Sequence, residues 1–188
     1  MMRVIAGTAK GVPIKFPKGA PTRPATELVR GAIFSILTAM EADYSRVLDL
    51  FSGSGSLGIE ALSRGAGWVD FVDRDRRACA IIGENLERAH LANRARIHCQ
   101  DILLALANLS GQYGIVLIDP PYADSNIGMV ITDLANSPLI TQQSIVIITH
   151  SARLNLKTSY CSLVLRREIR HGDSVIAMYR KQTERQNL

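Results

Sequence analysis

The sequence predicts an α/β protein with a seven-stranded, mostly parallel sheet that carries helices on both faces. From residue 46 to about residue 150, short apolar runs alternate with stretches whose apolar residues recur at helical spacing. Such strand–helix alternation is typical of a parallel sheet covered on both faces. Two further extended runs follow without a convincing helix between them, which indicates an antiparallel hairpin that closes the sheet.

The N-terminal part of the chain predicts a hairpin, a linker and a helix. Residues 2–17 read as two extended arms around a glycine-containing loop, and a hairpin this small needs other structure to pack against. Residues 17–26, rich in proline, glycine and threonine, are expected to link this hairpin to the helix. The helix has a polar face with Glu27, Arg30 and Ser35, and one apolar stripe formed by Val29, Ile33, Ile36, Leu37 and Met40.

The remaining elements follow from the same periodicities. Strands are predicted over 46–51, 68–73, 95–98, 114–119, 143–149, 161–168 and 173–180. Helices are predicted near 56–64, 75–89, 101–109 and 124–135. We therefore expect an N-terminal extension over 1–44, one main domain over 45–181 and a polar tail over 182–188.

Charge and composition narrow the classes of partner. The 188 residues carry a net charge of +5, and the first thirty hold six basic residues against one acid, Glu27. This asymmetry favours nucleic acid over a membrane surface. No stretch approaches the length of a transmembrane helix and the N-terminus lacks the apolar region of a signal peptide, so we expect a cytoplasmic protein. The three cysteines are widely spaced and the four histidines are isolated, so no metal site is expected.

A glycine-rich turn follows the first predicted strand of the main domain. Gly53 and Gly55 allow a tight turn and close approach of a ligand to the backbone, and Gly58 lets the following helix pack near the strand. Asp49 precedes the turn at the strand end. Its carboxylate would repel a pyrophosphate and attract an ammonium group, and S-adenosylmethionine carries one.

Acidic residues also end the next two strands. Asp73 lies about twenty residues after the glycines, where an acid can accept hydrogen bonds from both ribose hydroxyls of a nucleoside. Asp101 can accept from an adenine amino group while Ile102 covers the ring, although Asp101 fits equally well as the cap of the following helix. Asp75 fits best as a helix cap. Together with the glycine-rich turn, Asp49, Asp73 and Asp101 predict one nucleoside pocket.

The residues Asp119, Pro120, Pro121 and Tyr122 follow the buried run at 115–118. Two successive prolines make a stiff turn and donate no backbone hydrogen bonds. The carboxylate and carbonyl oxygens can therefore accept both hydrogens of an exocyclic amino group, while Tyr122 stacks on the ring that bears it.

These motifs resemble the class I S-adenosylmethionine-dependent methyltransferases. Residues 3–7, 22–24, 49–55 and 58–65 together are similar to the bacterial small-subunit (16S) ribosomal RNA (guanine-N2-)-methyltransferase family. The resemblance spans nearly the whole chain, and its N-terminal elements are the most specific. It implies a Rossmann-like methyltransferase fold and S-adenosylmethionine as the cofactor, with Phe51 and Ser54 also in the cofactor site.

The implied reaction is methyl transfer to the N2 amino group of a guanine in small-subunit ribosomal RNA, or in an assembly particle that contains it. Asp119 to Tyr122 would be the catalytic residues, and the protein is expected to act as a monomer without a metal. We expect contacts with RNA phosphates from Arg3, Lys10, Arg23 and Arg30.

Two positions depart from the family pattern, and three other functions stay open. Gly31 stands where the family usually has an acid, and Thr149 precedes His150 where a glutamate is more usual, so we assign no catalysis to His150. A DNA or RNA adenine-N6 methyltransferase would use the same two motifs. A nicotinamide-dependent dehydrogenase shares the glycine turn, but Asp49 and the Pro-Pro turn count against it. A non-catalytic RNA-binding protein on this scaffold is the third alternative.

Overall fold

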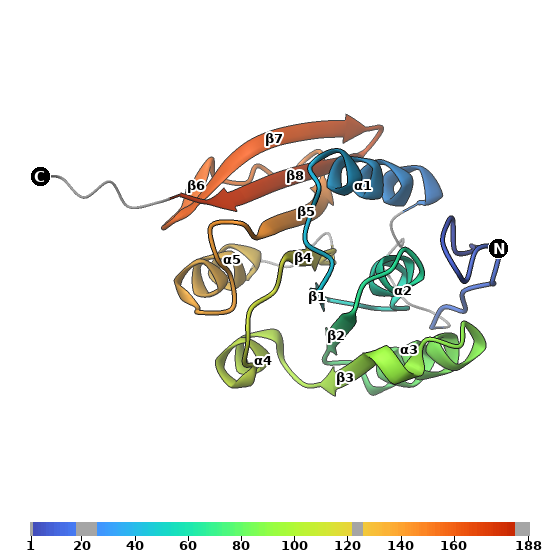
Figure 1. The fold of residues 1–188 in the computed structure, drawn as a ribbon. Coiled ribbons are helices and arrows are strands. Elements are labelled where there is room, and N and C mark those ends of the chain that lie inside the picture. Colours follow the sequence, from blue (N-terminus) through green and yellow to red (C-terminus); the bar gives the residue numbers. More distant parts are fainter. Residues whose placement is uncertain (1, 18–25, 122–125, 183–188) are drawn as a thin grey trace, which may run out of the picture.

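One mixed sheet organises the molecule in the computed structural model, which describes residues 2–17, 26–121 and 126–182 (Figure 1). Its eight strands lie in the order β3-β2-β1-β4-β5-β8-β7-β6. The first five run parallel, and β8, β7 and β6 continue the sheet as antiparallel strands. The predicted α/β class and the closing hairpin are therefore confirmed.

The strand bounds match the apolar runs of the sequence to within about three residues. The strands are β1 (Arg46–Leu50), β2 (Trp68–Asp73), β3 (Ala95–Cys99), β4 (Ile115–Ile118), β5 (Ile145–Ser151), β6 (Ser159–Tyr160), β7 (Leu163–His171) and β8 (Ser174–Lys181). The predicted count of seven is one too low. The missed strand is β6, whose two residues are too few to show any periodicity.

Helices cover both faces of the sheet. They are α1 (Glu27–Ala39), α2 (Ser56–Ser63), α3 (Arg76–Arg88), α4 (Ile102–Asn108) and α5 (Ile127–Asn136), with a short 3₁₀ turn η1 (Ala92–Arg94) before β3. Helices α1, α2 and α3 lie on one face, and α4 and α5 lie on the other (Figure 1). Side-chain oxygens of Asp75 and Asp101 cap α3 and α4, as their positions before the helices predict, and the Thr26 side chain caps α1.

The strands alternate between two apolar cores. Val47 and Leu117 pack under α1, α2 and α3, whereas Leu48 and Val116 pack against α4 and α5. All four side chains are fully buried. Because both faces of the sheet are covered, the ligand site is expected at the carboxyl edge of the parallel strands.

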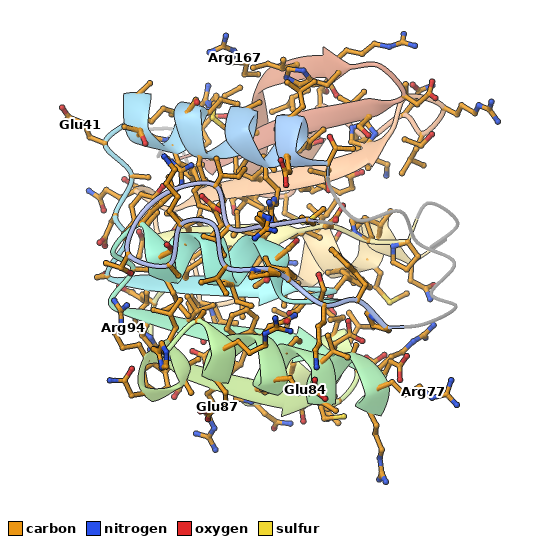
Figure 2. All side chains as sticks on the ribbon, turned by 90° about the vertical axis from the view of Figure 1, so that its right-hand side faces the viewer. Glu41, Arg77, Glu84, Glu87, Arg94 and Arg167 are labelled. Atoms are coloured by element: carbon orange, nitrogen blue, oxygen red, sulfur yellow. The ribbon has the colours of Figure 1, made fainter. Side chains whose placement is uncertain are left out.

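The N-terminal segment forms the predicted hairpin, but its arms are too short to count as regular strands. One antiparallel bridge joins Arg3 and Pro13, and backbone N–H groups donate from Val4 to Val12 (3.0 Å), from Gly11 to Val4 (2.9 Å) and from Ile14 to Met2 (3.0 Å). The hairpin packs on α2, and Figure 2 shows it in front of that helix. A Cβ atom on Gly7 would lie 1.8 Å from the backbone oxygen of Ser63, so the close contact requires glycine there. Docking on α2 supplies the packing that so short a hairpin needs.

Two buried polar side chains hold this segment in place. The Glu60 carboxylate accepts hydrogen bonds from the backbone N–H groups of Ile5 (2.7 Å) and Ala6 (3.0 Å). The Asn85 side chain accepts from the N–H of Lys15 (2.9 Å) and donates to the carbonyl oxygens of Lys15 (3.0 Å) and Ser54 (2.9 Å). Asn85 therefore joins the segment to the glycine-rich turn.

Candidate active site

A cavity of about 140 Å³ lies at the carboxyl edge of the parallel strands. Seven of the predicted site residues line it: Phe51, Gly53, Asp73, Asp101, Ile102, Asp119 and Pro121. Four lining residues were not predicted: Arg74, Leu103, Asn126 and Val130. Arg74 and Leu103 directly follow predicted residues in the chain. No sequence motif marks Asn126 and Val130 as site residues, because only the packing of α5 brings them to the cavity.

The glycine-rich turn wraps around Asp49. Gly53 and Gly55 have φ of 55° and 75°, and Phe51 adopts φ of 57°, in the left-handed region that disfavours side chains. Gly55 is the N-cap residue of α2, so its backbone conformation starts the helix. The N–H of Gly58 then donates to Asp49 Oδ2 at 2.9 Å. The predicted close approach at Gly58 is confirmed, since a Cβ there would lie 2.3 Å from the Phe71 ring.

The Asp49 carboxylate is buried and incompletely satisfied. The residue is 1% exposed, and Oδ1 has no hydrogen-bond partner among the described residues. Burial raises the pKa of this carboxyl well above its ordinary value, and the charges of Asp119 and Asp73 raise it further. A cationic donor at Oδ1 would both satisfy the oxygen and offset the repulsion. The carboxyl therefore fits the ammonium group of S-adenosylmethionine.

The acids at the ends of the next strands have structural partners as well. Asp73 accepts from the N–H of Gly53 at 2.8 Å and from the N–H of Asp75 at 2.9 Å, so the turn itself orients the carboxylate. Asp101 accepts from the N–H of Leu103 at 2.9 Å as the cap of α4. Its capping role is thus confirmed, and the same side chain also lines the cavity. Each carboxylate oxygen has a second lone pair that a ligand could use.

The Asp119 turn closes the other side of the cavity. Asp119 directly follows β4, and the Thr149 hydroxyl of β5 donates a hydrogen bond to its Oδ1. Pro120 is buried and Pro121 lines the cavity, so the stiff turn is fixed by the packing of Pro120. Tyr122 lies outside the described residues. The sequence does not predict the contact of Thr149 with Asp119, which follows from the pairing of β4 with β5.

The four residues predicted to contact RNA separate into two exposed, one buried and one outside the described residues. Arg3 and Lys10 are exposed on the N-terminal segment. Arg23 lies outside the described residues. The prediction for Arg30 is wrong, because its side chain is 0% exposed and donates to the carbonyl oxygen of Arg3. The periodicity of α1 shows which side faces the sheet, but it cannot show that the N-terminal segment covers a second side.

The sheet, with five parallel strands followed by three antiparallel strands at one edge, has the mostly parallel arrangement of the class I methyltransferases. The Escherichia coli candidate methyltransferase yhhF has the same fold, with a TM-score of 0.83 and 28% identity over 97% of this chain and 99% of that one. The fold therefore places the chain among the class I methyltransferases.

The chain belongs to the family described as conserved hypothetical protein 95, whose model matches residues 2–180. It is 34% identical to YlbH of Bacillus subtilis, proposed to be an rRNA methyltransferase, over 96% of this chain and 99% of that protein. It is 27% identical to ribosomal RNA small subunit methyltransferase D of Escherichia coli K12, over 97% of this chain and 91% of that protein. The family is thus one of methyltransferases, and it includes relatives named as small-subunit rRNA methyltransferases.

Membrane-spanning helices and metal-binding clusters are both absent from the part of the chain that the structure describes. None of its helices is long and apolar enough to cross a membrane. It contains no group of three or more histidine, cysteine, aspartate or glutamate side chains arranged to hold a metal ion.

Proposed function

We propose that this protein methylates the N2 amino group of a guanine in small-subunit (16S) ribosomal RNA, using S-adenosylmethionine, as a cytoplasmic monomer. The observation that carries the proposal is that one cavity joins the acids of a nucleoside site to the Asp119-Pro120-Pro121 turn. The named relatives support ribosomal RNA as the substrate. The preference for N2 of guanine rests on the motifs of the N-terminal segment.

The cofactor site follows from the donors and acceptors around the cavity. We assign the cofactor's ammonium group to Asp49, its ribose hydroxyls to Asp73, and its adenine to Asp101 and Ile102. We assign Phe51, Gly53, Ser54, Gly55 and Gly58 to the backbone approach to the ligand, since Phe51, Gly53 and Gly55 have left-handed φ and Gly58 lies in the first turns of α2. When bound, S-adenosylmethionine supplies the methyl group from its sulfonium.

The residues of the Asp119 turn would act on the base. The guanine amino nitrogen is a poor nucleophile, because its lone pair is delocalised into the ring. If the Asp119 carboxylate and the Pro120 carbonyl accept its two hydrogens, they favour a pyramidal nitrogen with the lone pair free to react. Positioning then supplies most of the acceleration. We propose Asp119 or water as the acceptor of the released proton, and Tyr122 as the residue that stacks on the unstacked base.

RNA phosphates would meet the exposed basic residues of the N-terminal segment. Arg3 and Lys10 are exposed there, and Arg23 is proposed from its sequence position. Contacts with phosphates position the substrate and make binding depend on salt. Reversing the charge of both Arg3 and Lys10 should weaken RNA binding and flatten its salt dependence. Unchanged binding would refute this part of the proposal.

The test is transfer of tritiated methyl from S-adenosylmethionine to small ribosomal subunits, or assembly intermediates, from cells that lack the enzyme. Wild type and Asp119→Ala are compared, with Asp133→Ala as the matched control because Asp133 is an exposed residue of α5. The product is digested to nucleosides. N2-methylguanosine from wild type and Asp133→Ala, but not from Asp119→Ala, would support the proposal. Methyladenosine in the product would favour the adenine-N6 alternative, and no product despite cofactor binding would refute the ribosomal substrate.

A further inference from the structure

Thr149 contacts the proposed catalytic carboxylate from the neighbouring strand. The parallel pairing of β4 with β5 sets Ile118 opposite Ile148, so the next residues along the two strands, Asp119 and Thr149, lie side by side. The Thr149 hydroxyl donates to Asp119 Oδ1 and lies 3.5 Å from the carbonyl oxygen of Ile118. Thr149 is only 4% exposed, so water does not compete freely for this hydrogen bond.

Asp119 lies among other acidic residues, which oppose its ionisation. Asp73 and Asp101 line the same cavity as Asp119, Asp49 is coupled electrostatically to Asp119 and Asp73, and Arg74 is the basic residue among the described residues that line the cavity. The electrostatic coupling between Asp49 and Asp119 opposes ionisation of both. A hydroxyl that donates to a carboxylate favours its ionised form. The Thr149 hydroxyl therefore opposes the effect of the neighbouring acids on Asp119.

The residues next to Thr149, across the sheet and along the strand, have other environments. Ile176, its partner on β8, is apolar and buried. His150, the next residue of β5, has its Nδ1 2.9 Å from the Ser151 carbonyl oxygen, and its Nε2, which has no hydrogen-bond partner among the described residues, lies 3.9 Å from Glu168. Thr149 thus supplies a neutral hydroxyl donor to Asp119.

We propose that Thr149 is a positioning residue, which holds Asp119 in one orientation and in the ionised form so that the carboxylate can accept a hydrogen of the substrate amino group. The inference rests on the proposed function and extends it to a residue that touches neither the cofactor cavity nor the base. A threonine that served only to fill space in β5 would be replaced without effect by valine, which has the same branched shape.

The first test compares wild type, Thr149→Val and Thr149→Ser in methyl transfer to small ribosomal subunits over a range of pH. With the hydroxyl removed, we expect kcat to fall about tenfold, as for loss of one charge-assisted hydrogen bond. The acidic limb of the pH–rate profile should move to higher pH, while KM for S-adenosylmethionine stays unchanged. Thr149→Ser should restore most of kcat and the original limb. Wild-type behaviour of Thr149→Val, or equal damage in both variants, would overturn the proposal.

A second measurement separates this inference from the proposed function. The ¹³C carboxyl signal of Asp119 is titrated in the cofactor-free protein and assigned by its loss in Asp119→Asn. In Thr149→Val the signal should titrate at higher pH than in wild type or Thr149→Ser, whatever the substrate proves to be. If wild type methylates no ribosomal RNA, the proposed function fails, and the titration alone decides the role of Thr149. Identical titrations in all three proteins would overturn that role, and thermal unfolding of each variant checks that it is folded.

Discussion

Replacing Glu60 with glutamine should detach the N-terminal segment from α2 and lower the stability of the protein. The Glu60 side chain is fully buried, and its two oxygens accept from the N–H groups of Ile5 and Ala6 and from the Arg64 guanidinium, whose Nε lies 2.7 Å from Oε1. Glutamine keeps the shape of the side chain. Its amide nitrogen, however, would face one of these donors and leave a buried N–H without an acceptor.

The magnitude follows from the bonds that are lost. One backbone hydrogen bond to a charged acceptor is removed, the other becomes a neutral hydrogen bond, and the buried ion pair with Arg64 disappears. Together these changes are expected to lower the free energy of unfolding by about 3 kcal/mol. For a chain of this size, that corresponds to a fall in Tm of about 6–12 °C.

Denaturant unfolding and thermal unfolding measure this change, and amide hydrogen exchange locates it. The amides of Ile5 and Ala6 should lose protection first. The matched control is Glu84→Gln, which removes the charge of an exposed carboxylate that pairs with Lys15 at 2.6 Å, and its unfolding midpoint should stay unchanged. A Glu60→Gln protein as stable as this control, with Ile5 and Ala6 still protected, would refute the reasoning.

Two further predictions concern the glycine turn and its acid. Gly58→Ala should destabilise the protein by about 1–3 kcal/mol despite better helix propensity, because the new Cβ would lie 2.3 Å from Phe71 Cε1. Asp49→Asn should abolish S-adenosylmethionine binding in calorimetry yet raise the free energy of unfolding by about 1–3 kcal/mol at pH 8. Burial raises the pKa of Asp49 in the folded protein above the ordinary carboxyl pKa near 4. Ionisation of Asp49 therefore lowers the free energy of unfolding of wild type increasingly as pH rises above about 4. At or below that pH, the free energies of unfolding of wild type and Asp49→Asn should converge.

Controls for these two predictions lie within the chain. Gly31→Ala should be neutral or slightly stabilising, because among the described residues no atom lies within 4 Å of its new Cβ. Equal effects of Gly31→Ala and Gly58→Ala would contradict the packing argument. An Asp49→Asn protein that is no more stable than wild type at pH 8 would contradict the assigned cost of the buried charge.

Much of the candidate site could be predicted because it depends on local features. Asp49, Asp73 and Asp119 each end a strand or directly follow one, and parallel strands bring their carboxyl ends to one edge. The glycine turn likewise needs its left-handed conformations wherever the domain folds. Seven of the predicted residues therefore line one cavity. The assignments of these residues to particular parts of the cofactor stay predictions.

The features that the sequence did not predict have other causes. The helical pattern predicts that Arg30 is exposed on α1. The N-terminal segment covers that side of the helix, and the carbonyl oxygen of Arg3 accepts from the Arg30 side chain. The N-terminal hairpin is present, but the sequence could not show that Glu60 of α2 accepts from its backbone. Strand β6 is too short to show a period. The contacts of Arg30 and of the hairpin join elements that lie apart in the sequence, whereas β6 was missed because of its length.

The sequence by itself determined the order of the strands and helices, the turns between them and the residues delivered to the carboxyl edge, because hydrophobic periodicity, capping and glycine conformation act within a few residues. Only the tertiary structure decided that Arg30 is buried, that Glu60 and Asn85 hold the N-terminal segment, and that Thr149 reaches Asp119. The reason is physical: a buried polar group must find its partner wherever the packed chain supplies one, and that partner is set by how whole elements meet rather than by the neighbouring residues.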